Sequence, residues 1–280
     1  MNKRFLSQLF RHRMAAPSFI VLVLMAASTF GTSLFFSPAD ANLINLDRAL
    51  EPPTWAHPFG TDDVGRDVFL RAMFGGQISL RIGFIAVLVS ISIGVSIGAI
   101  AGFYGGWIDN VLMRFTDALL AIPTLFLLIV ITRVFGQSIV VITIVLGALS
   151  WMEVSRLVRA NALSLKEQDF VTAAHAIGLS PMRILVRHIL PNTIAPIVVA
   201  ATLGVGRVIL LEATLSFLGL GLQPPTPSWG TMLNRAQSFL VSAPWLALLP
   251  GLLILVTVLC INFIGDALRD AMDPRGRRNG

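Results

Sequence analysis

The stretch KEQDFVTAAHAIGLSPMRILVRHILP, residues 166–191, is the longest polar island between apolar segments in the C-terminal half of the chain. Its first part, Gln168 to Ile177, predicts a short helix, and Gly178 follows where a left-handed terminating residue belongs. A second helix is predicted to begin at once, because Ser180 can cap it and Pro181 suits its first helical position. We therefore expect a helix, a glycine turn and a second helix.

Both predicted helices are amphipathic. In the first, the residues expected on one side are Phe170, Val171, Ala174 and Ile177. In the second, Arg183 and Arg187 lie four residues apart on one basic face. Leu185 and Ile189 lie on another face, and Pro191 is expected to end the helix.

A basic, amphipathic helix pair between two membrane-length segments is typical of a docking surface for a partner protein. Ala173, Ala174 and Gly178 are small, so they would let another protein's surface approach closely. The pattern leaves a second interpretation open, in which the helix pair has no partner or lies flat on the lipid headgroups.

The run TAAHAIG, followed by HILPN, resembles the loop that marks the permease subunits of ATP-binding cassette importers. The shared pattern is an Ala-Ala pair, a Gly four residues on, and then Ile-Leu-Pro. The resemblance implies that an ATPase docks on this stretch, through Asp169, Thr172, Ala173, Ala174, Gly178, Arg183 and Arg187. Thr172 departs from the family, since many members carry Glu there, and Asp169 could supply the charge one turn earlier.

The composition is that of an integral membrane protein. Of the 280 residues, 55% are hydrophobic and 13% are charged, whereas about a quarter are charged in soluble proteins. The net charge of +6 does not indicate nucleic-acid binding, because the basic residues stand at the ends of apolar segments rather than in one patch. The single cysteine, Cys260, excludes an intrachain disulfide.

Six apolar segments predict six transmembrane helices. Their expected ranges are 14–36, 82–108, 118–132, from the turn at 136–137 to about 152, 192–220 and 246–264. The first segment is longer than the core of a signal peptide and long enough to span a bilayer, although Ala39 and Ala41 leave cleavage open. The uncharged part of the third is short, so Arg133 is expected to reach the headgroups from its end.

The basic residues predict the orientation of these spans. Fourteen of the 21 Lys and Arg residues fall in the two terminal segments and the two loops on the same side. The six assigned to the opposite side are Arg48, Arg66, Arg71, Arg81, Arg133 and Arg235. We expect the protein in the cytoplasmic (inner) membrane. The bias predicts that both termini and residues 166–191 lie in the cytoplasm.

Two polar segments are expected outside the cytoplasm. HPFGTDDVGRDVF, residues 57–69, holds three aspartates and would suggest a metal site, but a capped helix start explains it better. In the segment 219–245 the prolines are expected to prevent a regular helix, and Trp229 and Trp245 suit the membrane interface. Both segments resemble the dipeptide, oligopeptide and nickel permease subfamily. We divide the chain into 1–78, with the first span and outer loop, and a permease core domain, 79–280.

Small residues recur at every fourth position of the second span, at Ser90, Gly94, Gly98 and Gly102. Such a stripe lets helix backbones approach closely in lipid, so we expect this helix inside the bundle or against a partner subunit. A pore lining is the alternative.

The fifth span carries two ionisable residues, Arg207 and Glu212. Five residues apart, they lie roughly 140° from each other around a helix and cannot pair on one face. Both are candidates for a translocation path. In the alternative interpretation, Glu212 reaches the outer interface and Arg207 bonds to a neighbouring helix.

No G-x-x-x-x-G-K-[ST] motif is present, and His57, His175 and His188 are scattered, so we expect neither ATP binding nor catalysis on this chain. The resemblance implies a permease subunit of a binding-protein-dependent importer, forming half of a path for di- or oligopeptides by alternating access. Its implied partners are a second homologous permease, two ATPase subunits that hold ATP-Mg, and an extracytoplasmic solute-binding protein, with no cofactor on this chain. The alternatives are a proton-coupled secondary transporter using Glu212 and a membrane-embedded enzyme or scaffold. Nickel and glutathione are alternative solutes.

Overall fold

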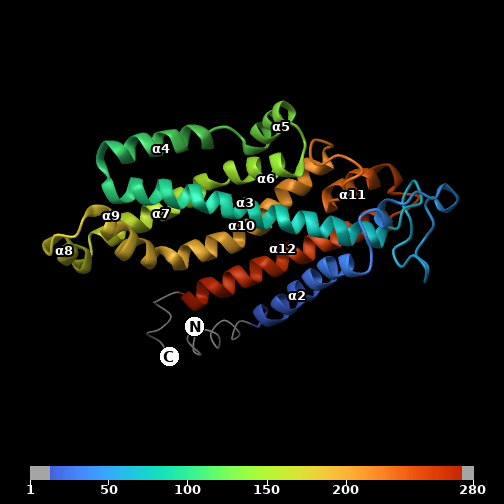
Figure 1. Cartoon of the computed structure of the whole chain (residues 1–280), viewed down its shortest axis with the longest axis horizontal. Helices are drawn as coiled ribbons and strands as arrows, with labels where there is room; N and C mark the ends of the chain where they lie inside the picture. The colour runs from blue at the N-terminus through green and yellow to red at the C-terminus, as the bar shows by residue number, and fades with distance from the viewer. Residues whose placement is uncertain (1–12, 273–280) are drawn as a thin grey trace.

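The apolar segments form long helices in the computed structural model, which describes residues 13–272 (Figure 1). The α-helices are α2 (Ala15–Gly31), α3 (Val68–Tyr104), α4 (Gly106–Leu120), α5 (Thr124–Phe135), α6 (Ile139–Ala148), α7 (Trp151–Lys166), α8 (Asp169–Ala176), α9 (Pro181–Ile184), α10 (Ile194–Phe217), α11 (Trp229–Ala236) and α12 (Trp245–Met272). Short 3₁₀ turns occupy Thr32–Leu34, Asp40–Asn42, Leu46–Arg48 and Gln237–Phe239. Lys3, Arg4, Arg11 and the basic residues after Met272 lie outside the described residues.

The predicted all-α membrane architecture is confirmed. Over residues 13–272, five helical runs are long and apolar enough to cross a membrane, and the bent pair of α4 and α5 makes a sixth. Between them these residues form no strand, only an isolated bridge that joins Thr61 to Asp67. In Figure 1, α8 and α9 lie at one end of the bundle, and α11 lies at the other. We call these the α8 end and the α11 end.

The central helix is α3, which packs against α2, α6, α7 and α10. The sequence prediction began this helix near Ile82, and that start was wrong by more than three turns. The helix begins at Val68, where Oδ1 of Asp67 caps it by accepting a hydrogen bond from Leu70 N at 2.8 Å. The early turns were missed because they carry polar residues such as Gln77, whose amide donates to Thr29 O at 2.6 Å. The helix runs through residue 78, and the division of the chain there stays a prediction.

The stripe of small residues on α3 faces α7. A Cβ added at Gly94, Gly98 or Gly102 would come within 2.7, 2.3 or 2.6 Å of an atom of α7. These glycines therefore allow direct contact between two helix backbones, as predicted, and they do not line a pore. Ser90 is also buried, and it borders a cavity described below.

The third span is broken, whereas the sequence predicted one helix over 118–132. The axes of α4 and α5 differ by 84°. The break falls before Thr124, at Pro123, which has no N–H to continue the ladder of α4. The fourth span is longer than predicted, since α6 and α7 form one run from Ile139 to Lys166.

The helix that begins at α9 does not end at Pro191, in contrast to the prediction. A π turn (Leu185–Ile189) and a 3₁₀ turn (Leu190–Thr193) join α9 to α10, so that Pro181–Phe217 is one helical run. A proline removes a backbone donor and crowds the carbonyl four residues before it, and the wider turn accommodates both effects.

The segment 219–245 contains a helix that the sequence analysis excluded. All of its prolines but the last precede Ser228, which starts α11 with a capping box shared with Thr231. Trp229 was expected at the membrane interface, and that prediction was wrong. Its side chain is fully buried, and its Nε1 donates to Ala72 O at 3.0 Å. The first turn of α11 is thereby inserted against α3.

Candidate functional site

The predicted helix-turn-helix is present at the α8 end. Helix α8 ends at Ala176, and Gly178 has the expected left-handed backbone, with φ of +79°. Leu179 N donates to Ala174 O at 3.2 Å across this turn, and Pro181 occupies the first turn of α9. Ser180 has the extended backbone of a capping residue, but its hydroxyl makes no capping hydrogen bond.

One side of this element packs on the chain's own core. The buried residues that it contributes are Val171, Ala174, Ile184, Leu185 and Ile189, and they pack with Ala99 of α3 and with Val158 and Ala162 of α7. Ala174 is therefore buried against the chain's own core and does not lie on the outside with the other predicted coupling residues. Phe170 and Ile177 are exposed, although they were predicted to lie on the same side as Val171.

The remaining predicted coupling residues are on the outside. These are Asp169, Thr172, Ala173, Gly178, Arg183 and Arg187, and we call them the α8–α9 surface. No atom lies within 4 Å of a Cβ added at Gly178, so this turn faces open space. The element projects beyond the other helices of the bundle (Figure 1). A partner can therefore reach this surface without displacing any described residue.

Arg207 of α10 forms an ion pair with Glu153 of α7. A bond from Arg207 to a neighbouring helix was one of the two interpretations of the sequence. The pair lies on the surface of the isolated chain, with 60% of the Arg207 side chain and 63% of the Glu153 side chain exposed. Sequence reasoning did not single out Glu153, because it placed the end of the fourth span at about Met152. In the structure α6 and α7 continue as one run to Lys166, and this run places Glu153 within the fourth span.

Both charges lie well inside helical runs that are long enough to span a membrane. Glu153 is 13 residues before Lys166, and Arg207 is 13 residues after Ile194. Each is therefore roughly 20 Å along its helix from the α8 end. A hydrocarbon core is about 30 Å thick, and a charged side chain at its centre costs about 2.5–3.5 kcal/mol or more. We therefore expect water or a partner subunit, rather than lipid, beside this face of α7 and α10 wherever it lies within the hydrocarbon core.

A second ion pair extends this face to α4. Arg156 follows Glu153 by three residues on α7 and lies 2.5 Å from Asp117 of α4, with 52% and 51% of the two side chains exposed. Residues three apart share a helix face. Asp117, Arg156, Glu153 and Arg207 thus form a charged band across α4, α7 and α10.

Next to the band is a groove made of two adjoining hollows of about 220 and 320 Å³. Both are bordered by Leu157, Ala200, Leu203 and Arg269. The first also contains Glu153, Arg207, Ser90 and Ser150, and the second reaches Met272, toward the α8 end. The walls are mostly apolar, but their charged and hydroxyl groups and this volume allow the groove to hold water or a small solute with polar ends.

Glu212 does not lie with Arg207, and its candidate place on a translocation path stays a prediction. Its side chain is fully buried, so it does not reach an outer interface, and it borders neither hollow of the groove. Its Oε1 accepts from Ser216 Oγ at 2.7 Å and from Ser228 Oγ at 2.8 Å, and its Oε2 accepts from Ser79 Oγ at 3.2 Å. Glu212 therefore joins α10 to α3 and to the cap of α11.

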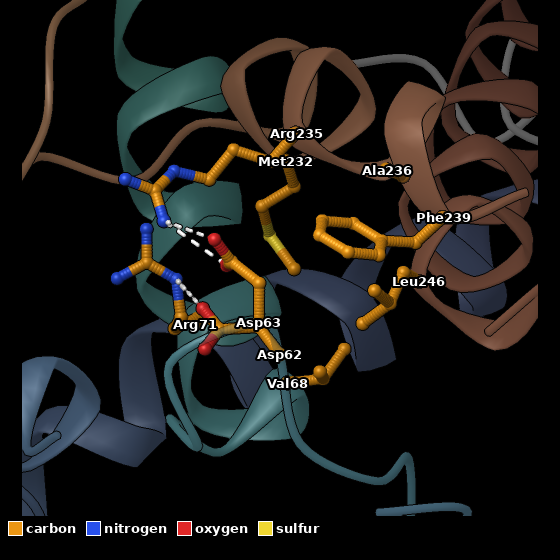
Figure 2. Close-up of a pocket in the computed structure, with 9 residues that line it drawn as sticks. All are labelled: Asp62, Asp63, Val68, Arg71, Met232, Arg235, Ala236, Phe239 and Leu246. Atoms are coloured by element: carbon orange, nitrogen blue, oxygen red, sulfur yellow. Dashed lines mark hydrogen bonds and ion pairs between the residues drawn. The ribbon is translucent and has the colours of Figure 1, made fainter. Parts of the chain in front are cut away.

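Asp62 and Asp63 of the first outer segment pair with arginines (Figure 2), whereas Asp67 pairs with His57. Asp62 lies 2.6 Å from Nη2 of Arg66 and 3.7 Å from Nε of Arg71, and Asp63 lies 3.1 Å from Nη1 of Arg235 on α11. In the described part of the chain, no group of His, Cys, Asp and Glu side chains is arranged to hold a metal ion. These contacts tie the outer segment to α3 and α11.

Known proteins share both the sequence and the fold. Residues 94–278 match the family of binding-protein-dependent transport system inner membrane components. The chain is 42% identical to a dipeptide transport system permease of Alkalihalophilus pseudofirmus, over 96% of this chain and 88% of that protein. It is 46% identical to a putative peptide permease of Brucella suis, over 92% and 85%. It is 42% identical to a glutathione transport system permease of Pectobacterium atrosepticum, over 98% and 89%.

A solved structure supports the fold alone. An inward-facing conformation of the MetNI methionine ABC transporter aligns with a TM-score of 0.57 at 20% identity, over 71% of this chain and 95% of that one.

Proposed function

The chain belongs to the inner-membrane components of binding-protein-dependent transport systems, the permease subunits of ATP-binding cassette importers, and we propose that it forms half of a translocation path for di- or oligopeptides. The named solutes of its relatives support this cargo class. Two are called dipeptide and peptide permeases, and the glutathione carried by the third is itself a short peptide. Nickel is the weaker alternative, since none of these three relatives is named for it.

The charged band is the observation that carries the path assignment. Its charged side chains are at least half exposed in the isolated chain, and Glu153 and Arg207 lie about 20 Å along their helices from the α8 end, so within a membrane they would need water or a partner subunit beside them. A second, homologous permease facing α4, α7 and α10 would enclose the groove between the two subunits. The path would then run along this face, with Arg207 on it and Glu212 outside it.

The α8–α9 surface is the proposed docking site for an ATPase subunit. Asp169, Thr172, Ala173 and Gly178 would contact the partner, and Arg183 and Arg187 would pair with acidic groups on it. Val171 and Ala174, on the buried side of the element, pack it against α3 and α7. ATP-Mg would be bound and hydrolysed on two such partners, and this chain would contribute no catalytic residue and bind no cofactor.

This assignment also implies an orientation. Both termini and the α8–α9 surface would lie in the cytoplasm, in accord with the bias of basic residues. The α11 end would face outward, toward the solute-binding protein. Closure of the ATPases on ATP would pull on the docked element and turn the groove from the inner to the outer side, which is alternating access.

A proton-coupled transporter is the competing function, and the position of Glu212 argues against it. A carboxylate that relays protons needs access to water from one side at a time, whereas three serine hydroxyls surround this one inside the bundle.

Reconstitution separates the two functions. The chain, its second permease and its ATPases would be placed in liposomes with the loaded binding protein outside, and entry of L-alanyl-L-alanine would be measured. We expect uptake that requires ATP and stops with an ATPase variant unable to hydrolyse it. Uptake by this chain alone, driven by a proton gradient, would refute the proposal.

A further inference from the structure

We propose that Glu153 and Arg207 form a site for the two charged ends of a zwitterionic peptide, with the ammonium group at Glu153 and the carboxylate at Arg207. This inference rests on the proposed function, because it places cargo in the groove. It goes beyond that function by naming the groups of the cargo that the path recognises.

The exposure of this ion pair distinguishes it from a structural one. Arg159 and Asp109 also join α7 to α4, through two hydrogen bonds of 2.5 and 2.6 Å, and only 12% of the Asp109 side chain is exposed. Glu153 and Arg207 also come from two helices, but 63% of the Glu153 side chain and 60% of the Arg207 side chain are exposed, and both residues border the groove. A solute in the groove can therefore reach both groups.

The charges of the groove suit a zwitterion. Among the described residues that border the two hollows, Glu153 is the one carboxylate, and Arg207 and Arg269 are the cations. Glu153 thus offers an anionic partner to a cargo ammonium group, and the two arginines offer cationic partners to a cargo carboxylate. Ser90 and Ser150 also border the first hollow, and the Ser150 hydroxyl, which donates to Leu146 O at 2.7 Å, can still accept from a peptide N–H.

Exchange of partners would cost little. An exposed ion pair contributes little to stability, because water screens both charges. When a zwitterion enters, the one contact between Glu153 and Arg207 is replaced by two, one to the ammonium group and one to the carboxylate. The site would recognise only the ends, which all linear peptides share, so passage would not depend on the side chains of the cargo.

Binding of dipeptides with free and blocked ends measures this recognition. The probes are L-alanyl-L-alanine, its N-acetyl derivative and its C-terminal amide, titrated by NMR into the purified complex without ATP or binding protein. We expect the two blocked forms to bind wild type at least fivefold more weakly than the free dipeptide. In Glu153→Gln the N-acetyl and free forms should bind equally, and in Arg207→Gln the amide and free forms should bind equally.

Arg235→Gln is the matched control, because Arg235 also joins two segments by an ion pair but lies at the α11 end. It should keep the wild-type preference for free ends. Wild type that binds no dipeptide, or binds free and blocked forms equally, would overturn the inference without any variant. So would either groove variant that assembles with its ATPases and keeps the full preference. Uptake of the free dipeptide by wild type tests the proposed function separately, so the two failures are distinguishable.

Discussion

Gly98 lies at the shortest of the three approaches between α3 and α7, and Gly98→Ala is expected to force these helices apart. The added Cβ would stand 2.3 Å from the carbonyl oxygen of Ser155, where contacts below 3.0 Å essentially never occur. This oxygen belongs to the backbone of α7 and cannot rotate away as a side chain would. The helices must therefore separate by most of an ångström or bend locally.

The magnitude follows from two opposing effects. Overpacking a tight contact by one methyl group costs about 1–3 kcal/mol. Alanine in place of glycine favours the helix by roughly 0.5–1 kcal/mol. The net loss should be about 1–2 kcal/mol, which changes the ratio of folded to unfolded protein by a factor of about 5–30.

Unfolding by SDS in mixed micelles, followed by circular dichroism, measures this loss. The control is Gly206→Ala on α10, where the nearest atom to an added Cβ is 3.5 Å away, an ordinary contact. We expect the control to unfold at or above the SDS fraction of wild type and Gly98→Ala to unfold clearly below it. If both variants behave alike, α3 and α7 are not in backbone contact, and the glycine stripe faces the path instead.

Three further predictions concern coupling, the buried carboxylate and orientation. Gly178→Val should insert and fold, because its Cβ meets no described atom within 4 Å, but the left-handed backbone at this position would cost a valine on the order of 1–2 kcal/mol. Uptake, and ATPase stimulation by loaded binding protein, should both be lost. Wild-type values of both would mean that Gly178 is a surface turn with no role in coupling. Glu212→Gln should keep uptake, because an amide oxygen can still accept from two serines; lost uptake with normal abundance and ATPase activity would revive proton coupling. In a Cys260→Ser background, an impermeant thiol reagent should label Trp55→Cys in intact cells and leave Gln168→Cys unlabelled, and the reverse would invert the topology; Trp55 is fully exposed.

The sequence predicted what depends on local pattern. Apolar length located the spans, and the order of Gly178, Ser180 and Pro181 located the turn between α8 and α9, because backbone preferences act over a few residues. It could not predict the first turns of α3, whose polar side chains are satisfied by residues far away in the chain. Gln77, for example, bonds to Thr29, 48 positions earlier.

The candidate site was missed for the same reason. Arg207 was found as a charge within a span, but its partner Glu153 is 54 positions away on another helix. Glu212 looked equally functional in the sequence, yet Ser79, 133 positions away, and Ser228 complete its hydrogen bonds. Only the packing of α3, α7, α10 and α11 separates a charge beside the groove from one enclosed in the bundle.

The connection between the α8–α9 surface and the charged band suggests how a partner could control the path. At one side, α7 carries Glu153 and ends at Lys166, and two residues separate it from the start of α8 at Asp169. At the other side, α9 continues without a loop into α10, which carries Arg207. The helices that hold the two charges are therefore the direct extensions of the docking element, and no flexible linker lies between them. Because Val171 and Ile184 pack on the same core as Val158, a displacement of the element must move α7 and α10 with it. We expect the distance between Glu153 and Arg207 to change as an ATPase opens and closes, so that the same movement that turns the groove also releases the ends of the peptide.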